Sequence, residues 1–312
     1  MSESRFQILS LDGGGLKGIF TAAFLAKWET DTGNSVVDHF DLIAGTSTGG
    51  IIALGLGLGL SATEILNFYE TKAESIFTRR ALGNLKHWFF VKHSSEGLES
   101  ALRGIFAERI LGESRRPLVI PSYYAARGQL YLFKTPHHKR LRSDWKEKVI
   151  DVARATAAAP TYFSPYIKES GLELVDGGVW ANNPVMLGIS EALGYFGKRQ
   201  EMVAALRIGT TYEVRSVEAF ASDGGKLSMC AAAIDYMLRG QEHSASAMAR
   251  HILTEHRYYE VNPAVPPGDF ALDKLSKELI ALADHEYRFH SSDLDERGFF
   301  RHRAAPYTPY YP

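Results

Sequence analysis

One serine stands in a setting typical of a nucleophile. Ser47 is the centre of residues 45–49, GTSTG, which have the pattern G-x-S-x-G and follow an apolar run at 40–44. When such a pattern forms a sharp turn between a strand and a helix, the serine hydroxyl is exposed at the carboxyl edge of a sheet. The helix behind it points its positive end at the site and favours developing negative charge. The pattern predicts that Ser47 attacks an acyl carbon, with an ordinary helix cap as the alternative.

A glycine-rich segment could stabilise the product of that attack. Residues 12–18, DGGGLKG, come directly after residues 6–11, a short apolar run that predicts a buried strand. The successive N–H groups of Gly13, Gly14 and Gly15 can form a concave anion-binding nest. Beside an attacking serine, such a nest is an oxyanion hole, and loss of one of its donors lowers the rate by roughly 10²–10³.

The same glycines also satisfy the fingerprint of a dinucleotide cofactor site. Gly13, Gly15 and Gly18 match G-x-G-x-x-G between a predicted strand and a predicted helix. That interpretation needs an acidic residue about 20 positions further on, at the end of the second strand. Residues 45–47, GTS, occupy that end instead. The oxyanion interpretation is therefore favoured, and we expect no organic cofactor.

A carboxylate is available to activate the serine, whose hydroxyl is a poor nucleophile at neutral pH. Asp176 follows the apolar run 172–175 and precedes two glycines, so it is expected at the same sheet edge, although an ordinary turn would look alike. A Ser–His–Asp triad is an alternative, because several histidines follow Asp176 in the chain, among them His243, His251, His256 and His285. His137 and His138 are adjacent and do not predict a metal site, since sequence neighbours rarely converge on one ion.

The elements that must position these residues alternate along the chain. Strands are predicted near 6–11, 40–44, 118–123, 130–133, 172–175 and 203–208, and helices near 17–30, 61–76, 149–159 and 184–196. Such alternation predicts an α/β fold, with a mainly parallel sheet between two helical layers. The pattern becomes mainly helical after 216, with an apolar stripe over 270–287. We expect a single domain over 1–312, with a catalytic core at about 6–210 and a helical C-terminal extension at about 216–300.

Composition limits the partners. The chain has 312 residues, 45% of them hydrophobic, with 35 basic and 36 acidic residues. This balance predicts no binding to DNA or RNA polymers. The single cysteine, Cys230, excludes an internal disulfide. Residues 1–5 do not resemble a signal peptide, and the apolar stretch 51–60 is too short to span a bilayer. We expect a cytoplasmic protein.

Together, the three motifs resemble those of the patatin-like phospholipases, and residues 155–163, ATAAAPTYF, look like the family's segment ahead of its aspartate. The resemblance covers about 6–208 and implies a three-layer α/β/α fold and a Ser–Asp dyad without histidine. It implies Ser47 as nucleophile, Asp176 as base, and an oxyanion hole formed by Gly13, Gly14, Gly15 and the amide of Thr48. Lys17 stands where many members have arginine, and it lacks the bidentate fork.

Residues 9–20, LSLDGGGLKGIF, are also similar to bacterial anti-phage (CBASS-type) patatin effectors. That similarity implies a phospholipase that is activated by a cyclic dinucleotide such as cyclic GMP-AMP and attacks membrane phospholipids at the inner face of the membrane. Esterase activity without nucleotide control, or a binding module without catalysis, are the alternatives. Assembly into a homo-oligomer stays open.

Several segments could contact an activator or a membrane. The basic and aromatic candidates are Arg79-Arg80, Tyr123-Tyr124 with Arg127, and residues 137–140, HHKR, although each alone is typical of solvated surface. Residues 85–92, LKHWFFVK, suit either an interfacial anchor that makes transient membrane contact or a buried segment.

Overall fold

The computed structural model describes residues 5–76, 95–213, 226–254, 256–266, 270, 273 and 276–311. Arg79, Arg80, the segment 85–92 and the side chain of Cys230 lie outside the described residues. The strands are β1 (Phe6–Leu11), β2 (Leu42–Gly45), β3 (Leu118–Tyr124), β4 (Gln129–Lys134), β5 (Tyr166–Ile167), β6 (Glu173–Asp176), β7 (Val203–Ile208), β8 (Tyr212–Glu213), β9 (Tyr258–Val261) and β10 (Ala264–Val265).

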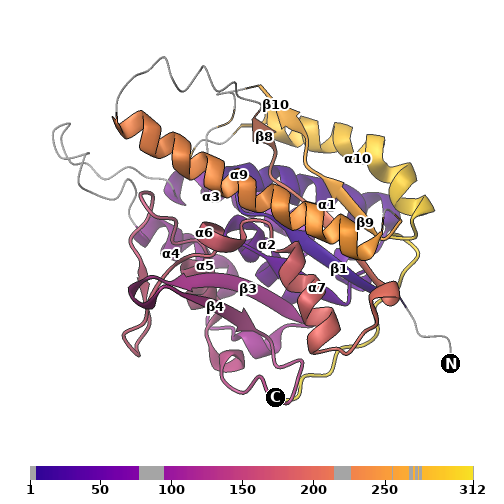
Figure 1. Cartoon of the computed structure of the whole chain (residues 1–312), viewed down its shortest axis with the longest axis horizontal. Helices are drawn as coiled ribbons and strands as arrows, with labels where there is room; N and C mark the ends of the chain where they lie inside the picture. Colours follow the sequence, from indigo (N-terminus) through magenta and orange to yellow (C-terminus); the bar gives the residue numbers. More distant parts are fainter. Residues whose placement is uncertain are drawn as a thin grey trace.

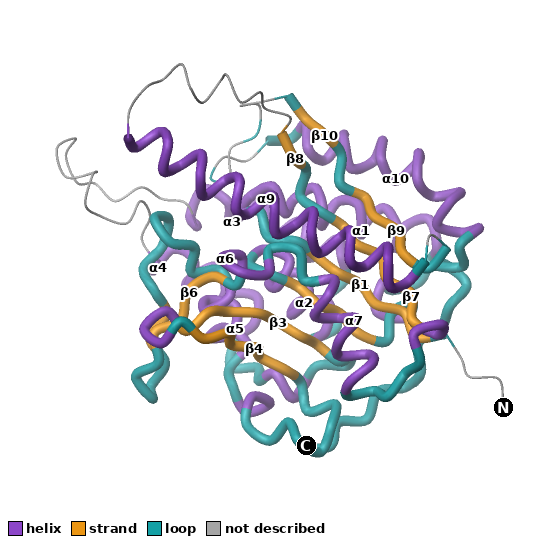
Figure 2. The backbone as a smooth tube through the Cα atoms, viewed as in Figure 1, coloured by secondary structure: helices purple, strands orange, loops and turns teal. Residues whose placement is uncertain are grey.

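Eight of these strands form one sheet (Figure 2). Successive pairings run β5-β6-β3-β2-β1-β7-β9, and β4 pairs with β3 in addition. β3, β2, β1, β7 and β9 pair in parallel, each with the next. β4 and β6 both pair antiparallel to β3, and β5 pairs antiparallel to β6. The predicted mainly parallel sheet is confirmed, and its antiparallel part is confined to one end.

Helices cover both faces of the sheet (Figure 1). They are α1 (Gly18–Thr32), α2 (Thr48–Gly57), α3 (Ala62–Ile76), α4 (Ser95–Phe106), α5 (Val149–Thr156), α6 (Gly178–Ala181), α7 (Val185–Gly194), α9 (Lys226–Leu253) and α10 (Glu278–Glu296). Alternate residues of β1 belong to different core clusters: Leu9 and Leu11 face the side of α1 and α2, whereas Phe6 and Ile8 face α7 and α9. This period of two produces the three-layer α/β/α architecture that was predicted.

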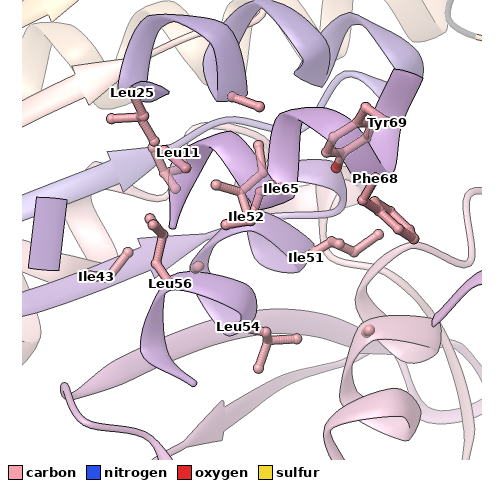
Figure 3. Close-up of a cluster of buried hydrophobic side chains, with 14 of the residues drawn as sticks. Leu11, Leu25, Ile43, Ile51, Ile52, Leu54, Leu56, Ile65, Phe68 and Tyr69 are labelled. Carbon is pink, nitrogen blue, oxygen red and sulfur yellow. The ribbon is translucent and has the colours of Figure 1, made fainter. Parts of the chain in front are cut away.

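Helix α2, which begins directly after Ser47, is apolar on all sides. Its Ile52, Leu54 and Leu56 are fully buried, in one cluster with Ile43 of β2 and Ile65 of α3 (Figure 3). A helix that is hydrophobic all round must be enclosed by other elements. Burial of each such side chain stabilises the fold by about 1.5–3 kcal/mol. The helix behind Ser47 is therefore held firmly in place.

The C-terminal region contributes to the sheet as well as to the helical layers. α9 and α10 fit the predicted helical character, although α10 begins at Glu278 and not at 270 as the apolar stripe predicted. In addition, β9 pairs with β7 from Ala205↔Tyr258 to Ile208↔Val261, and β10 pairs with β8. The prediction of a mainly helical extension missed these short strands, because four or two residues carry too little alternation to detect. No helix in the described ranges combines the length and apolar character needed to cross a bilayer.

Candidate active site

Ser47 lies in a strained turn between β2 and α2. Its backbone has φ 53° and ψ −120°, a conformation that few residues other than glycine adopt. The flanking glycines make the turn possible: a Cβ on Gly45 would lie 2.3 Å from the carbonyl oxygen of Gly49, and one on Gly49 would lie 2.2 Å from that of Leu11. Close packing of backbone on backbone thus explains both glycines of G-x-S-x-G.

The structure brings Ser47 and Asp176 together. Both side chains are buried, and the Ser47 hydroxyl donates a hydrogen bond of 2.7 Å to Asp176 Oδ2. β2 and β6 lie on the same side of β3, β2 beside its beginning and the antiparallel β6 beside its end. The carboxyl ends of β2 and β6 therefore meet, which places residues 129 positions apart in hydrogen-bond contact.

The environment of Asp176 suits a general base. Burial raises its pKa from 3.8 to about 6, partly opposed by hydrogen bonds from the Ser47 hydroxyl and the Gly178 N–H. The carboxylate is thus mostly ionised at neutral pH and holds a proton more readily than an exposed aspartate. In the part of the chain that the structure describes, neither Ser47 nor Asp176 has a histidine as hydrogen-bond partner, which does not support the triad alternative.

The glycine-rich loop lies against the serine turn. A Cβ on Gly13 would lie 3.2 Å from Ser47 Cβ. The Gly13 N–H already donates to the carbonyl of Asn182 at 3.1 Å. Within the described residues, the N–H groups of Gly14, Gly15 and Thr48 have no such partner. Of the four amides that the sequence suggested for an oxyanion hole, that of Gly13 is engaged within the protein, and the other three have no hydrogen-bond acceptor among the described residues.

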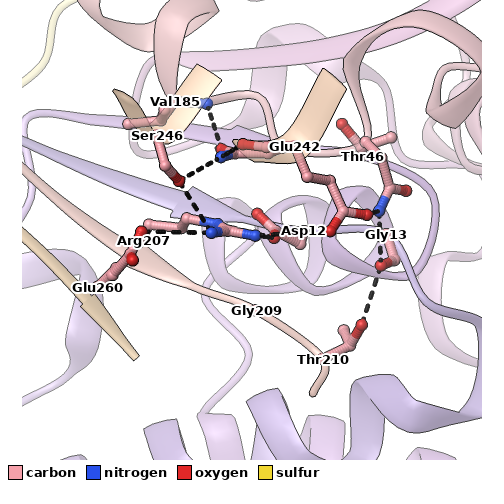
Figure 4. Close-up of polar contacts among 12 residues, drawn as sticks. Asp12, Gly13, Thr46, Val185, Arg207, Gly209, Thr210, Glu242, Ser246 and Glu260 are labelled. Atoms are coloured by element: carbon pink, nitrogen blue, oxygen red, sulfur yellow. Dashed lines mark hydrogen bonds and ion pairs between the residues drawn. The ribbon is translucent and has the colours of Figure 1, made fainter. Parts of the chain in front are cut away.

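A buried ion pair anchors this loop, and sequence reasoning missed it. Asp12 accepts hydrogen bonds from the guanidinium of Arg207, with 2.9 Å between Arg207 Nε and Asp12 Oδ2 (Figure 4). Arg207 also contacts Ser246 of α9 at 2.9 Å and Glu260 of β9 at 3.3 Å. An arginine inside the apolar run 203–208 was the available signal, because a buried charge requires a partner.

Other sequence candidates are separated or already engaged. Lys17 is buried and donates to the carbonyl of Thr211 at 3.3 Å. Arg127 lies at the turn between β3 and β4, whereas residues 137–140 follow the opposite end of β4. His137 is buried, with its Nε2 2.7 Å from Glu191 Oε1, so the solvated-surface interpretation is wrong for it. The structure therefore does not join these residues into one nucleotide pocket.

Comparisons with known proteins identify the family and the fold of the chain. A family model described as Patatin-like phospholipase matches residues 9–189. A cGAMP-activated phospholipase of Pseudomonas aeruginosa is 35% identical over 279 residues, covering 87% of this chain and 83% of that protein. One from Escherichia coli is 39% identical over 228 residues, covering 68% and 64%. The structure of VipD from Legionella pneumophila aligns with a TM-score of 0.52 at 16% identity, covering 94% of this chain and 67% of VipD, and shows the same fold.

Proposed function

The chain belongs to the patatin-like phospholipase family, and we propose that Ser47 and Asp176 are the dyad with which it hydrolyses the acyl esters of phospholipids. The observation that carries this proposal is the 2.7 Å hydrogen bond between a buried carboxylate and a serine held in a strained turn. A hydroxyl so placed is ready to lose its proton during attack.

Side chains and amides of this chain can supply the catalytic groups, and water is the second substrate. Asp176 accepts the Ser47 proton as Ser47 Oγ attacks the ester carbonyl carbon. The N–H groups of Gly14, Gly15 and Thr48 stabilise the resulting oxyanion. As the ester C–O bond breaks, the leaving alcohol takes the proton from Asp176. Asp176 then accepts a proton from water, which attacks the acyl group, and Ser47 leaves with that proton as the fatty acid is released.

Replacement of the serine tests the dyad. Ser47→Ala is expected to keep its fold, to release no fatty acid from phospholipid vesicles and to resist labelling by a fluorophosphonate. The matched control is Ser190→Ala, which changes an exposed serine of α7 and should behave like the wild type. Hydrolysis by Ser47→Ala at the wild-type rate would refute the assignment.

Control by a nucleotide is the finer part of the proposal. Relatives named cGAMP-activated phospholipase are 35% and 39% identical to this chain over most of its length, which supports cyclic GMP-AMP as activator. Fatty acid release should be low without nucleotide and should rise with cyclic GMP-AMP, but not with a linear dinucleotide. Equal release with and without nucleotide would favour an unregulated esterase. Sedimentation during the same titration measures any assembly into a homo-oligomer.

Access to phospholipid requires contact with a membrane, and we place this at the cytoplasmic face. Three exposed apolar side chains belong to elements at the end of the sheet that holds Asp176: Leu130 at the start of β4 (60% exposed), Ile167 of β5 (62%) and Val179 of α6 (44%). Leu130→Ser with Ile167→Ser should lower activity on vesicles and spare a soluble ester. Phe289→Ser is the control, because this side chain is 72% exposed on distant α10 (Figure 1). An equal loss of activity of the double variant on vesicles and on the soluble ester would exclude this surface as the site of membrane contact.

A further inference from the structure

The hydroxyl of Thr156 forms a hydrogen bond with the backbone of Ser47, the proposed nucleophile. Thr156 ends α5 and is fully buried. Its Oγ1 accepts a hydrogen bond of 3.0 Å from the N–H of Ser47 and donates one of 2.6 Å to the carbonyl of Pro121 in β3. The donor and an acceptor position of this hydroxyl are thus both used, and both partners are main-chain groups of the elements that carry the site.

The same short segment also holds the base. The N–H of Asp176 donates to the carbonyl of Ala158 at 3.0 Å, and the N–H of Gly177 donates to the carbonyl of Thr156 at 3.4 Å. Residues 156–158 therefore contact the main chain on both sides of the Ser47–Asp176 hydrogen bond. A displacement of this segment would change the distance between the two catalytic groups.

Ser47 needs such a constraint. Its φ of 53° is unfavourable for a residue with a Cβ, and conformations of this kind persist only where the surroundings over-determine them. The Ser47 N–H precedes α2 and has no acceptor within that helix, so Thr156 Oγ1 supplies the one that the buried amide requires. Without this acceptor, the turn would lose the contact that fixes the orientation of Ser47.

We propose that Thr156 is a positioning residue for the acyl-transfer reaction: its hydroxyl fixes the Ser47 backbone so that Ser47 Oγ meets both Asp176 and the substrate carbonyl. This inference rests on the proposed Ser47–Asp176 dyad. Thr156 takes no proton from the serine hydroxyl, because its Oγ1 faces the Ser47 amide. Its contribution is geometric, and misplacement of a reacting group by about 1 Å can cost roughly 10²-fold in rate.

Two substitutions separate the hydroxyl from the shape of the side chain. Thr156→Val keeps the branched shape and removes the hydroxyl, whereas Thr156→Ser keeps the hydroxyl and removes the methyl group that packs near Gly50. With purified full-length protein and a soluble ester, Thr156→Val should lower kcat by roughly 10²-fold with KM unchanged. It should slow fluorophosphonate labelling by a similar factor. Thr156→Ser should stay within about threefold of the wild type.

A role in packing alone predicts the opposite ranking, because Thr156→Ser creates the larger cavity. Wild-type kcat in Thr156→Val, or an equal loss in both variants, would overturn the proposal. If Thr156→Val does not fold, Thr156→Ser and Thr156→Ala provide the same comparison, since they differ only in the hydroxyl. Ser47→Ala run alongside distinguishes the two failures. Its inactivity beside a fully active Thr156→Val would refute the positioning role alone, whereas its activity would refute the dyad itself.

Discussion

Asp176→Asn should remove hydrolysis and at the same time stabilise the fold at neutral and alkaline pH. Burial raises the pKa of Asp176 from 3.8 to about 6, so the folded protein binds this proton more tightly than the unfolded chain does. The stability that this proton supplies is complete below pH 3.8 and is lost as the pH rises through 6. Two pH units correspond to about 3 kcal/mol of unfolding free energy. Asparagine has no charge to bury and can still accept the Gly178 N–H.

Urea denaturation at several pH values measures this difference. Asp176→Asn should exceed the wild type by about 3 kcal/mol at pH 8 and by less than about 1 kcal/mol at pH 4. Asp284→Asn is the control, because this aspartate lies on the surface of α10, where its ion-pair partner among the described residues is exposed Arg288, and it should change stability by less than about 1 kcal/mol. A lower stability of Asp176→Asn at pH 8, or a gain that is the same at both pH values, would refute the burial argument.

Three further predictions concern the same region. kcat/KM on a soluble ester should rise as the pH increases through about 6, because Asp176 must be ionised to act as base, and a flat profile between pH 5 and 7 would contradict this. Arg207→Gln should lower the unfolding free energy by about 3–5 kcal/mol in urea, because it leaves the buried Asp12 charge without its main partner; a loss below about 1 kcal/mol would count against the anchor. Gly14→Ala should lower kcat by at least about 10²-fold, since its Cβ would lie 2.0 Å from the hydroxyl oxygen of Thr210. Gly104→Ala should leave kcat unchanged, because its Cβ would meet no described residue outside its own helix turn within 4 Å. Similar kcat values in the two variants would show that the loop at Gly14 is not sterically restricted.

Local patterns carried most of the fold prediction. The strands at 6–11, 118–123 and 203–208 were placed within a residue of their observed bounds, because each is a short run of mostly buried residues rich in apolar side chains. Ser61 and Glu64 have the S-x-x-E spacing that is typical of a capping box, and the two residues exchange hydrogen bonds at the start of α3. The pairings β5–β6 and β7–β9 could not be predicted from such patterns. The partner of a short strand is determined by the packing of the whole sheet and not by the residues of the strand itself.

The sequence by itself determined which residue types could do chemistry, since a serine and a carboxylate that each follow a strand and precede glycines have few other uses in combination. Only the tertiary structure decided how they meet. The antiparallel β6 brings Asp176 to the end of β2. Arg207, 195 positions away in the chain, forms an ion pair with Asp12, and Thr156 accepts a hydrogen bond from the Ser47 N–H. These contacts depend on the register of the strands and on the direction of the hydrogen bonds, which are determined when distant segments pack together. Neither the register nor the hydrogen bonds correspond to a periodic pattern or a motif in the sequence.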